Sequence, residues 1–331
     1  MSEFLKHDLT APVDKALRGG VLAIGNFDGV HRGHQSVLQT ARDIAAQAGA
    51  PCFVLSFEPH PRTLFKPESP VFRLTPPDMK ANVLRAFGMD GLLILPFDFA
   101  TASTTADDFV TEILLGRAGA SHVVSGFNFH FGKNRAGSPE FLKQAGQDRG
   151  FGVTIVDAKS DENSEPISSS RIRRSLGSAN VEEAAGLLGY RWCVSGEVVK
   201  GQQLGRTLGY PTANLALSPN CHLAHGIYAV RLRTADGVLH NGVASYGRRP
   251  TFDNGAALLE TFIFDYSGDL YGQDITVSLF THLRGEEKFA SAEALVEQMK
   301  QDDAQARAAL AGVTPLSVLD KTLNFDGLKS Q

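Results

Sequence analysis

The sequence has few cysteines, no excess of basic residues and no long apolar runs. Its three cysteines lie far apart without a CxxC pair, so they form no disulfide framework, and we expect a reducing, cytoplasmic environment. No stretch reaches the roughly 18 apolar residues of a membrane span, and the first residues lack the pattern of a signal peptide, so we expect neither membrane insertion nor secretion. With 32 Lys and Arg against 36 Asp and Glu, the net charge is -4, which excludes a generally basic nucleic-acid binder.

Glycine, in contrast, is abundant. The chain of 331 residues contains 33 glycines, about a tenth of the total where ~7% is usual. Those that are easiest to interpret fall in two loops, residues 25–33 and 196–209, one in each half of the chain. At roughly 100–200 residues per domain, the length favours two domains. We therefore expect one nucleotide-facing loop in each domain.

The first half alternates short apolar strands with amphipathic helices. Strands separated by helices form parallel βαβ crossovers, so we predict a doubly wound parallel α/β domain over residues 1–187. In such sheets, ligands bind beyond the carboxyl ends of the strands. The predicted strands are 21–24, 51–57, 91–95, 122–125 and 153–156, and the predicted helices are 35–48, 77–87, a segment capped by Thr105, a segment around 171–174, and 181–188.

The second half changes to a period of two. Residues 227–233, 259–266 and 275–280 alternate apolar and polar side chains between turn residues, which is typical of antiparallel strands. One long helix, opened by Ser291, follows them. We predict a mostly antiparallel β-barrel with a long terminal helix over residues 188–331.

A glycine-rich turn directly follows the predicted strand at 21–24. Residues 25–34 read Gly-Asn-Phe-Asp-Gly-Val-His-Arg-Gly-His and precede a helix, whose N-terminus offers free N–H groups and a positive dipole end to phosphate. His31 and His34 are candidate catalytic residues, because two imidazoles can donate hydrogen bonds to a phosphate chain as charge builds on it. The candidate nucleotide-binding residues of this turn are Gly25, Phe27, Asp28 and Gly33.

A serine-rich helix start supports the same site. Residues 167–173 read Ile-Ser-Ser-Ser-Arg-Ile-Arg, which places hydroxyls at the start of a helix and a guanidinium one turn later. We predict that Ser169 and Ser170 bind nucleotide. Arg173 is a candidate catalytic residue that would clamp departing pyrophosphate.

The second glycine cluster leads into Pro211-Thr212-Ala213-Asn214. We expect the glycines to form a flexible flap over phosphates, with the rigidly held hydroxyl of Thr212 and amide of Asn214 below it. Thr212 is a candidate Mg²⁺ ligand, since this cation prefers oxygen. A glycine-rich barrel hairpin without a ligand is the alternative. The candidate nucleotide-binding residues here are Gly201, Gly205, Arg206, Gly209, Thr212 and Asn214.

Glu260 is the candidate general base of the second half. By strand parity it shares a face with Phe262 and Phe264, and an apolar setting raises the pKa of a carboxylate. A surface glutamate at a strand end is the alternative. We predict that Glu260 is a catalytic residue.

The motifs together resemble known families. The pair His-x-Gly-His and Ile-Ser-Ser-Ser-x-Ile-Arg resembles the HxGH / ISSTxIR nucleotidylyltransferase superfamily. Both motif sets in this order resemble the bifunctional riboflavin kinase / FAD synthetase of bacteria, with further matching segments at 57–62, 126–132, 247–252, 268–272 and 283–289. The sequence departs from the usual family residues at Ser245-Tyr246 (Asn-Ile), Tyr210 (Phe), Ser170 (Thr) and Gly285 (Pro).

The resemblance implies two consecutive reactions. In the C-terminal domain, the 5′-hydroxyl of riboflavin attacks ATP to give FMN, with Glu260 as the base and with Thr212 and Asn214 as ligands of Mg²⁺ and nucleotide. In the N-terminal domain, FMN attacks a second ATP and gives FAD and pyrophosphate. The residues matching that reaction are His31, His34, Ser169 and Arg173, and the expected flavin-binding residues are His60, Asn128 and Arg284.

Other functions remain open at this stage. An adenylyltransferase for pantetheine phosphate or nicotinamide mononucleotide explains the first half but leaves the barrel idle. A tRNA-charging enzyme also uses His-x-Gly-His, but it needs an anticodon-binding region. A non-catalytic flavin sensor would keep aromatic pockets without phosphate chemistry. We expect small-molecule substrates, no nucleic acid, no membrane, and a monomer or weak homo-oligomer.

Overall fold

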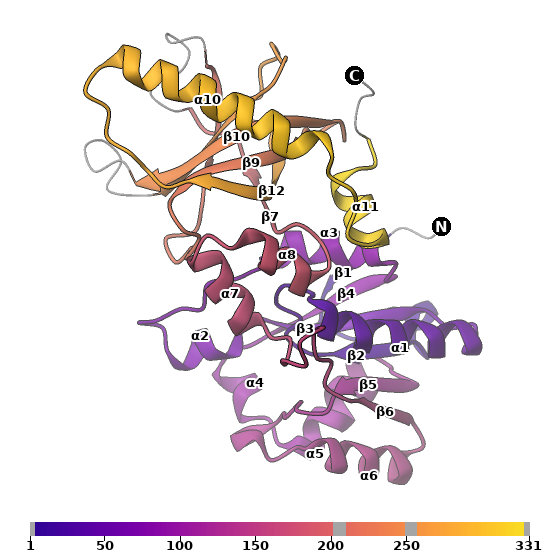
Figure 1. Ribbon diagram of the computed structural model, residues 1–331. Helices are drawn as coiled ribbons and strands as arrows, with labels where there is room; N and C mark the ends of the chain where they lie inside the picture. Colours follow the sequence, from indigo (N-terminus) through magenta and orange to yellow (C-terminus); the bar gives the residue numbers. More distant parts are fainter. Residues whose placement is uncertain (1–3, 201–209, 249–256, 328–331) are drawn as a thin grey trace. The chain divides into compact units, whose positions relative to one another are not determined.

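The computed structural model describes residues 4–200, 210–248 and 257–327, which form two compact units (Figure 1). The units are Met1–Ser168 and Ser169–Gln331. The predicted domain boundary at residues 187/188 lies further along the chain and stays a prediction. Four predicted nucleotide-binding residues lie outside the described residues: Gly201, Gly205, Arg206 and Gly209.

The first unit is built on a parallel sheet, as predicted. Its six strands lie in the order β1-β4-β3-β2-β5-β6, and every pairing is parallel. The central strand β2 pairs with both β3 and β5, so the turn that follows β2 opens at the middle of the carboxyl edge. The strands are β1 Leu5–Asp8, β2 Val21–Ile24, β3 Cys52–Glu58, β4 Gly91–Pro96, β5 His122–Gly126 and β6 Gly152–Val156.

Helices connect these strands and bury apolar faces against the sheet. In α1, Val37, Leu38, Ala41 and Ala45 are buried, as the apolar periodicity of residues 35–48 predicts, whereas Ile44 is half-buried and Ala48 is exposed. Thr105 caps α5 by accepting a hydrogen bond from the Asp108 amide at 3.1 Å, but the chain then continues as the π-helix η2. The helices are α1 Arg32–Ala48, α2 Pro61–Phe65, α3 Pro77–Phe87, α4 Phe99–Ser103, α5 Ala106–Asp108, η2 Phe109–Arg117 and α6 Pro139–Arg149, with the short 3₁₀ helices η1 Lys15–Leu17 and η3 Lys133–Arg135.

The second unit contains the predicted antiparallel barrel. Its six strands follow the order β7-β12-β9-β10-β11-β8, and all pairings are antiparallel. An antiparallel bridge between Val199 and Asn214 joins the chain after β7 to β8, which nearly closes the barrel. The strands are β7 Cys193–Glu197, β8 Thr212–Ala216, β9 Gly226–Arg233, β10 Leu239–Arg248, β11 Ala257–Ile263 and β12 Asp274–Arg284.

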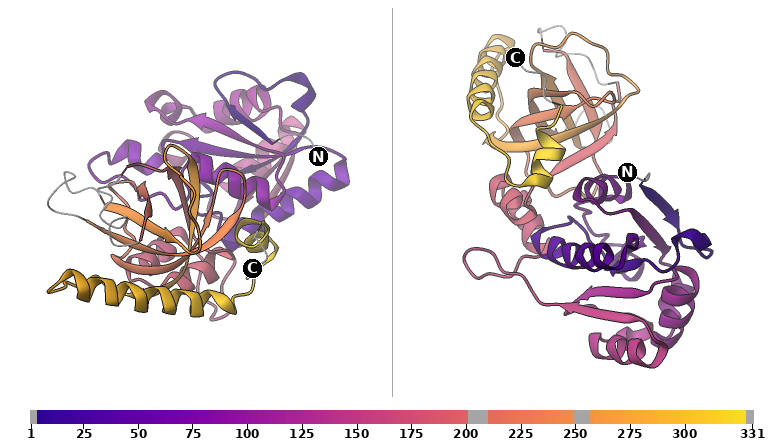
Figure 2. Two further views of the ribbon diagram at one scale, coloured as in Figure 1. Left: turned by 90° about the horizontal axis from the view of Figure 1, so that it is seen from above. Right: turned by 90° about the vertical axis from the view of Figure 1, so that its right-hand side faces the viewer.

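Helices flank this barrel within the second unit. Helix α10, Ala292–Ala311, lies along the barrel, and Ser291 caps it by accepting a hydrogen bond from the Ala294 amide at 3.2 Å (Figure 2). The predicted strand at 259–266 ends earlier, at Ile263, because the chain turns at Asp265 with a φ of 54°. The other helices of this unit are α7 Ser169–Gly177, α8 Val181–Leu188 and α11 Val318–Asn324.

Candidate active sites

His31 and His34 lie together at the N-terminus of α1. His31 is the N-cap residue, and its Nδ1 accepts a hydrogen bond from the His34 amide at 3.3 Å. The two imidazoles are stacked, with ring centroids 3.6 Å apart and an interplanar angle of 17°. The structure therefore brings both predicted histidines to a helix N-terminus at the carboxyl edge of the parallel sheet, where an anion is favoured.

The environment of His34 keeps its imidazole neutral. Burial, and then the charges of His31 and Lys80, lower the pKa of His34 well below its ordinary value of 6.5. Its Nδ1 is buried and has no hydrogen-bond partner among the described residues. A buried nitrogen of this kind suits a ligand that supplies the missing partner.

Aromatic packing shapes the turn that precedes the histidines. The ring of Phe27 is buried and meets His34 edge-on at a centroid distance of 5.3 Å. A Cβ at Gly25 would lie 3.2 Å from the Phe27 ring, and a Cβ at Gly33 would lie 3.2 Å from the His31 ring. These two glycines thus permit the close approach of the rings. Whether Gly25, Phe27 and Gly33 contact a nucleotide stays a prediction.

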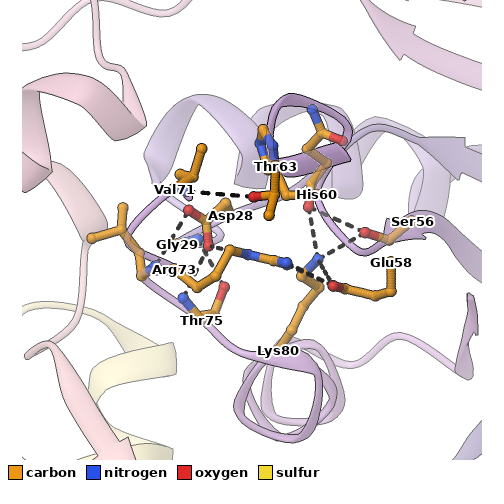
Figure 3. A network of polar contacts seen from close by, with 12 residues as sticks. Asp28, Gly29, Ser56, Glu58, His60, Thr63, Val71, Arg73, Thr75 and Lys80 are labelled. Carbon is orange, nitrogen blue, oxygen red and sulfur yellow. Dashed lines mark hydrogen bonds and ion pairs between the residues drawn. The ribbon is translucent and has the colours of Figure 1, made fainter. Parts of the chain in front are cut away.

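Asp28 anchors the turn from below. Its carboxylate accepts hydrogen bonds from the amides of Leu74 at 3.2 Å and Thr75 at 3.0 Å (Figure 3). The amide of Gly29 donates to Oγ1 of Thr75 at 2.8 Å. The turn is therefore fixed to the segment before α3, and a direct contact of Asp28 with a nucleotide stays a prediction.

Sequence reasoning missed an ion network beneath the same turn. Arg73 donates two hydrogen bonds to the carboxylate of Glu58, at 2.5 and 2.6 Å, and its Nε lies 3.6 Å from Asp28. Lys80 on α3 completes the network with an Nζ–Oε1 distance of 3.3 Å to Glu58 (Figure 3). Burial alone would raise the pKa of Glu58, but the hydrogen bonds and charges of Arg73 and Lys80 outweigh it and lower that pKa.

The predicted flavin-binding residues of the first unit follow neighbouring strands of the sheet. His60 comes directly after β3 and caps α2, its Nδ1 accepting a hydrogen bond from the Arg62 amide at 3.2 Å. Asn128 comes after β5, and its carbonyl oxygen lies 3.1 Å from Nδ1 of His130. Because parallel strands end at one edge, both residues are on the same edge as His31. Their contact with flavin stays a prediction.

The predicted serine–arginine clamp lies on α7. Ser169 is the first residue of this helix, and Ser170 and Arg173 follow in its first turns. The neighbouring Arg171 pairs with Glu183 of α8 at 3.0 Å, so that arginine serves the packing of the two helices. Helix α7 belongs to the second unit, and the joint action of its residues with His31 and His34 stays a prediction.

The barrel places Thr212, Asn214 and Glu260 on one face. In the pairing of β8 with β11, Asn214 lies opposite Glu260 and Thr212 lies opposite Phe262. The hydroxyl of Thr212 donates to Oδ1 of the buried Asn214 at 3.4 Å. The ring of Tyr210 packs edge-on against Phe262, with centroids 4.8 Å apart. The half-buried Glu260 thus shares its face with Phe262 as predicted.

Phe264, the other expected neighbour of Glu260, lies beyond the end of β11. Its ring instead meets Phe262, with centroids 6.1 Å apart, and belongs to the apolar cluster that includes Ala306 and Leu310 of α10. Of the two aromatic neighbours that strand alternation predicts for Glu260, only Phe262 therefore lies on β11.

Two oxygen donors of the barrel fit a hard cation. The side-chain oxygens of Thr212 and Asn214 lie 3.4 Å apart. Among the described residues, no group of three or more His, Cys, Asp or Glu side chains could hold a metal. Mg²⁺ commonly takes only one or two protein ligands and shares the rest with substrate phosphates and water, so this pair suits it.

Arg284, the predicted flavin residue of the barrel, is held by α10. Its Nε and Nη2 donate to the carboxylate of Asp302 at 2.8 and 2.7 Å, and its Nη1 donates to the carbonyl of Gly285 at 2.9 Å. The hydrogen bond to Asp302 raises the pKa of Arg284. The arginine thus fixes the start of the loop after β12, and its contact with flavin stays a prediction.

Comparison with known proteins covers both units. Residues 13–171 match the family model of FAD synthetase, and residues 188–310 match that of riboflavin kinase. The bifunctional riboflavin kinase/FMN adenylyltransferase of Pseudomonas fluorescens is 41% identical over 296 residues, which are 89% of this chain and 94% of that protein. The chain belongs to the family of bifunctional riboflavin kinase/FMN adenylyltransferases. The Escherichia coli K12 relative, of the same name, is 37% identical over 87% of this chain and 92% of its own length.

The family places a kinase and a nucleotidyltransferase in one chain, with an N-terminal FAD synthetase domain and a C-terminal riboflavin kinase domain. A crystal structure of a protein from Streptococcus pneumoniae, named a macrolide-efflux protein, is 31% identical with a TM-score of 0.80 and covers 92% of this chain and 98% of its own. Its name describes that protein alone. In the part of the chain that the structure describes, no helix is long and apolar enough to cross a membrane.

Proposed function

We propose that this chain phosphorylates riboflavin to FMN in its barrel and adenylylates FMN to FAD at the turn of residues 25–34, here called the His31/His34 turn. The observation that carries the proposal is the pairing of Glu260 with Asn214 in the barrel, which puts a carboxylate beside the candidate nucleotide residues. The family resemblance of both halves supports the same division.

The kinase reaction needs a base, because an alcohol must lose its proton to attack phosphorus. Glu260 accepts the proton of the 5′-hydroxyl while that oxygen bonds to the γ-phosphorus of ATP and ADP leaves. Thr212 and Asn214 hold Mg²⁺, which supplies charge neutralisation on the phosphates when bound. Because Thr212 and Asn214 lie on the same face of the paired strands as Glu260, the strand register fixes the distance between the nucleotide and the base.

The adenylyl transfer needs no base, because the attacking phosphate of FMN is already anionic. Its oxygen bonds to the α-phosphorus of ATP and pyrophosphate leaves, so catalysis reduces to positioning and charge stabilisation. The helix N-terminus, His31 and His34 donate to the phosphate chain, and Ser169, Ser170 and Arg173 serve the departing pyrophosphate. The nearby carboxylates of Asp28 and Glu58 are engaged by amides, Arg73 and Lys80, which agrees with a site without a general base.

We further propose that the enzyme acts in the cytoplasm as a monomer or weak homo-oligomer, on small molecules and without nucleic acid. Its three free cysteines and net charge of -4 support this assignment. Light scattering of the purified protein at several concentrations tests the oligomeric state, and a stable larger assembly would contradict it.

Product analysis tests the function directly. Purified protein is incubated with riboflavin, Mg²⁺ and ATP, and the flavins are separated. We expect FMN first and then FAD. Riboflavin left unchanged under varied conditions would overturn the proposal, and FMN without FAD would overturn its second half.

A further inference from the structure

Lys80 is a buried lysine at the centre of the ion network. Its side chain is almost fully enclosed, and its Nζ donates to Oγ of Ser56 at 2.7 Å and to the carbonyl of Asn26 at 2.8 Å. The third contact is the carboxylate of Glu58 at 3.3 Å. The ammonium therefore uses all three of its donors, and it links the end of β3 with the Asn26 carbonyl of the His31/His34 turn (Figure 3).

The turn that Lys80 contacts has an unfavourable backbone. Phe27 and Val30 adopt positive φ values of 45° and 39°, a region that side chains other than glycine rarely enter. Such a conformation persists only where the surroundings hold it. Several hydrogen bonds do so here. Lys80 and Ser56 donate to the Asn26 carbonyl, the amides of Leu74 and Thr75 donate to Asp28, and Nε2 of Gln35 donates to the Val30 carbonyl.

The network is costly for the fold. It balances two carboxylates, Asp28 and Glu58, against two cations, Arg73 and Lys80, but taking four charges out of water is rarely repaid in stability. Burial, and then the charge of Arg73, lower the pKa of Lys80 to about 8. Uncharged side chains at positions 58 and 80 together would avoid this cost, so stability alone does not explain the lysine.

We propose that Lys80 is a positioning residue for adenylyl transfer, which fixes the Asn26 carbonyl and with it the turn that presents His31 and His34. The proposal rests on the function proposed above. The wild-type conversion of FMN to FAD tests that function, whereas only the variants and the pH profile below test the role of Lys80.

The central experiment separates positioning from charge balance. K80M leaves Glu58 partly uncompensated, whereas the double variant K80M/E58Q removes one charge of each sign. We expect both to convert FMN to FAD at least about tenfold more slowly, mainly through kcat, with the thermal midpoint recovering in the double variant. If the double variant recovers both the midpoint and the FAD rate, the lysine serves charge balance only and the proposal is wrong.

Two controls accompany these variants. E58Q keeps the bonds of Lys80 to Asn26 and Ser56, so it should lose less adenylyl transfer than K80M; an equal or larger loss contradicts the proposal. R85M changes an exposed cation on the same helix and should leave the rate within about twofold. Riboflavin phosphorylation in each sample reports the integrity of the second unit, and the thermal midpoint reports that of the first.

The wild-type enzyme provides an independent test if K80M and K80M/E58Q fail to fold. Lys80 faces Asp28, Glu58, Arg73 and the neutral His34, and its charge is lost as the pH rises through about 8. We expect the FMN-to-FAD rate to fall across this range while the kinase rate shows no such step. Since the pKa of Lys80 is lowered from 10.5, its contribution to folding stability grows above pH 8, so unfolding through this group does not explain the fall. A rate that stays constant from pH about 7 to about 9 overturns the proposal.

Discussion

The two units hold their candidate phosphate-handling groups in different ways. In the first unit, His31 and His34 lie on a turn between a strand and a helix, and side chains from other segments hold that turn. In the second unit, Thr212, Asn214 and Glu260 lie on two paired strands, whose backbone ladder fixes their spacing. A parallel sheet binds ligands with the loops at the ends of its strands, whereas a barrel binds them with side chains on the faces of its strands.

This difference also concerns which groups surround each candidate site. After Gly25, whose amide still bonds to Leu55 of β3, the turn of the first unit leaves the strand ladder, and the ion network of Asp28, Glu58, Arg73 and Lys80 lies beside it. In the barrel, the buried Asn214 needs no such support, since its backbone pairs with β11 on one side and with Val199 on the other. Sites on loops therefore depend on distant side chains, and sites on strands depend on register.

The largest expected effect separates the two reactions. Glu260→Ala removes the base that riboflavin's hydroxyl needs, so we expect phosphorylation to fall about 10³-fold. The conversion of FMN to FAD should stay within about twofold, because that nucleophile is already anionic. Each half-reaction is measured with its own flavin substrate. Glu297→Ala, at an exposed position of α10, is the matched control, and an equal loss of both activities by Glu260→Ala would refute the assignment.

The second prediction tests the first unit. His34→Ala removes one candidate donor to the phosphate chain, and we expect FAD formation from FMN to fall about 10²-fold with riboflavin phosphorylation unchanged. His122→Ala is the matched control, because His122 begins β5 at the opposite edge of the same sheet. If the His122 variant loses as much adenylyl transfer as the His34 variant, the loss reflects folding rather than the site.

The sequence predicts those parts of the fold and the site that lie close together along the chain. Apolar periodicity locates α1, α3 and α10, and the His-x-Gly-His spacing finds the stacked pair because one helical turn brings His31 and His34 together. Strand β1 is missed because it is only four residues long and half-exposed, with alternating burial. In η2 the apolar residues Phe109, Ile113 and Leu114 recur at a spacing that also suits an α-helix, so the sequence does not reveal a π-helix.

The ion network is missed for a different reason. Glu58, Arg73 and Lys80 belong to three separate segments, and only the fold brings them together. One signal was present: Lys80 falls between Met79 and Val83 on the buried side of a helix that the sequence does predict. A lysine on an apolar helix face is almost always paired when it is buried, so it indicates an unseen carboxylate partner.

A third prediction asks whether the barrel also depends on a buried ion pair. Asp302→Asn weakens the hold of α10 on Arg284, where the carboxylate is 5% exposed. We expect the free energy of unfolding of the second unit to fall by about 3 kcal/mol and the KM for riboflavin to rise, with the FMN-to-FAD rate preserved. Denaturant unfolding and both rates are measured together. Asp303→Asn, beside it on the same helix, is the control, and an equal loss of stability there would contradict the role of the buried pair.

The smallest effect is expected at Gly285, where the usual family residue is proline. A Cβ at this position would meet nothing within 4 Å, and its φ lies outside the positive range that favours glycine. Gly285→Ala should therefore raise the free energy of unfolding by about 0.4–1 kcal/mol, because it restricts the unfolded chain, and should leave the kinase rate nearly unchanged. Denaturant unfolding and riboflavin phosphorylation check both outcomes. If this substitution lowers the kinase rate as strongly as the loss of a turn anchor lowers adenylyl transfer, then the barrel site also depends on a loop, and the distinction between a site held by side chains and a site held by strand register fails.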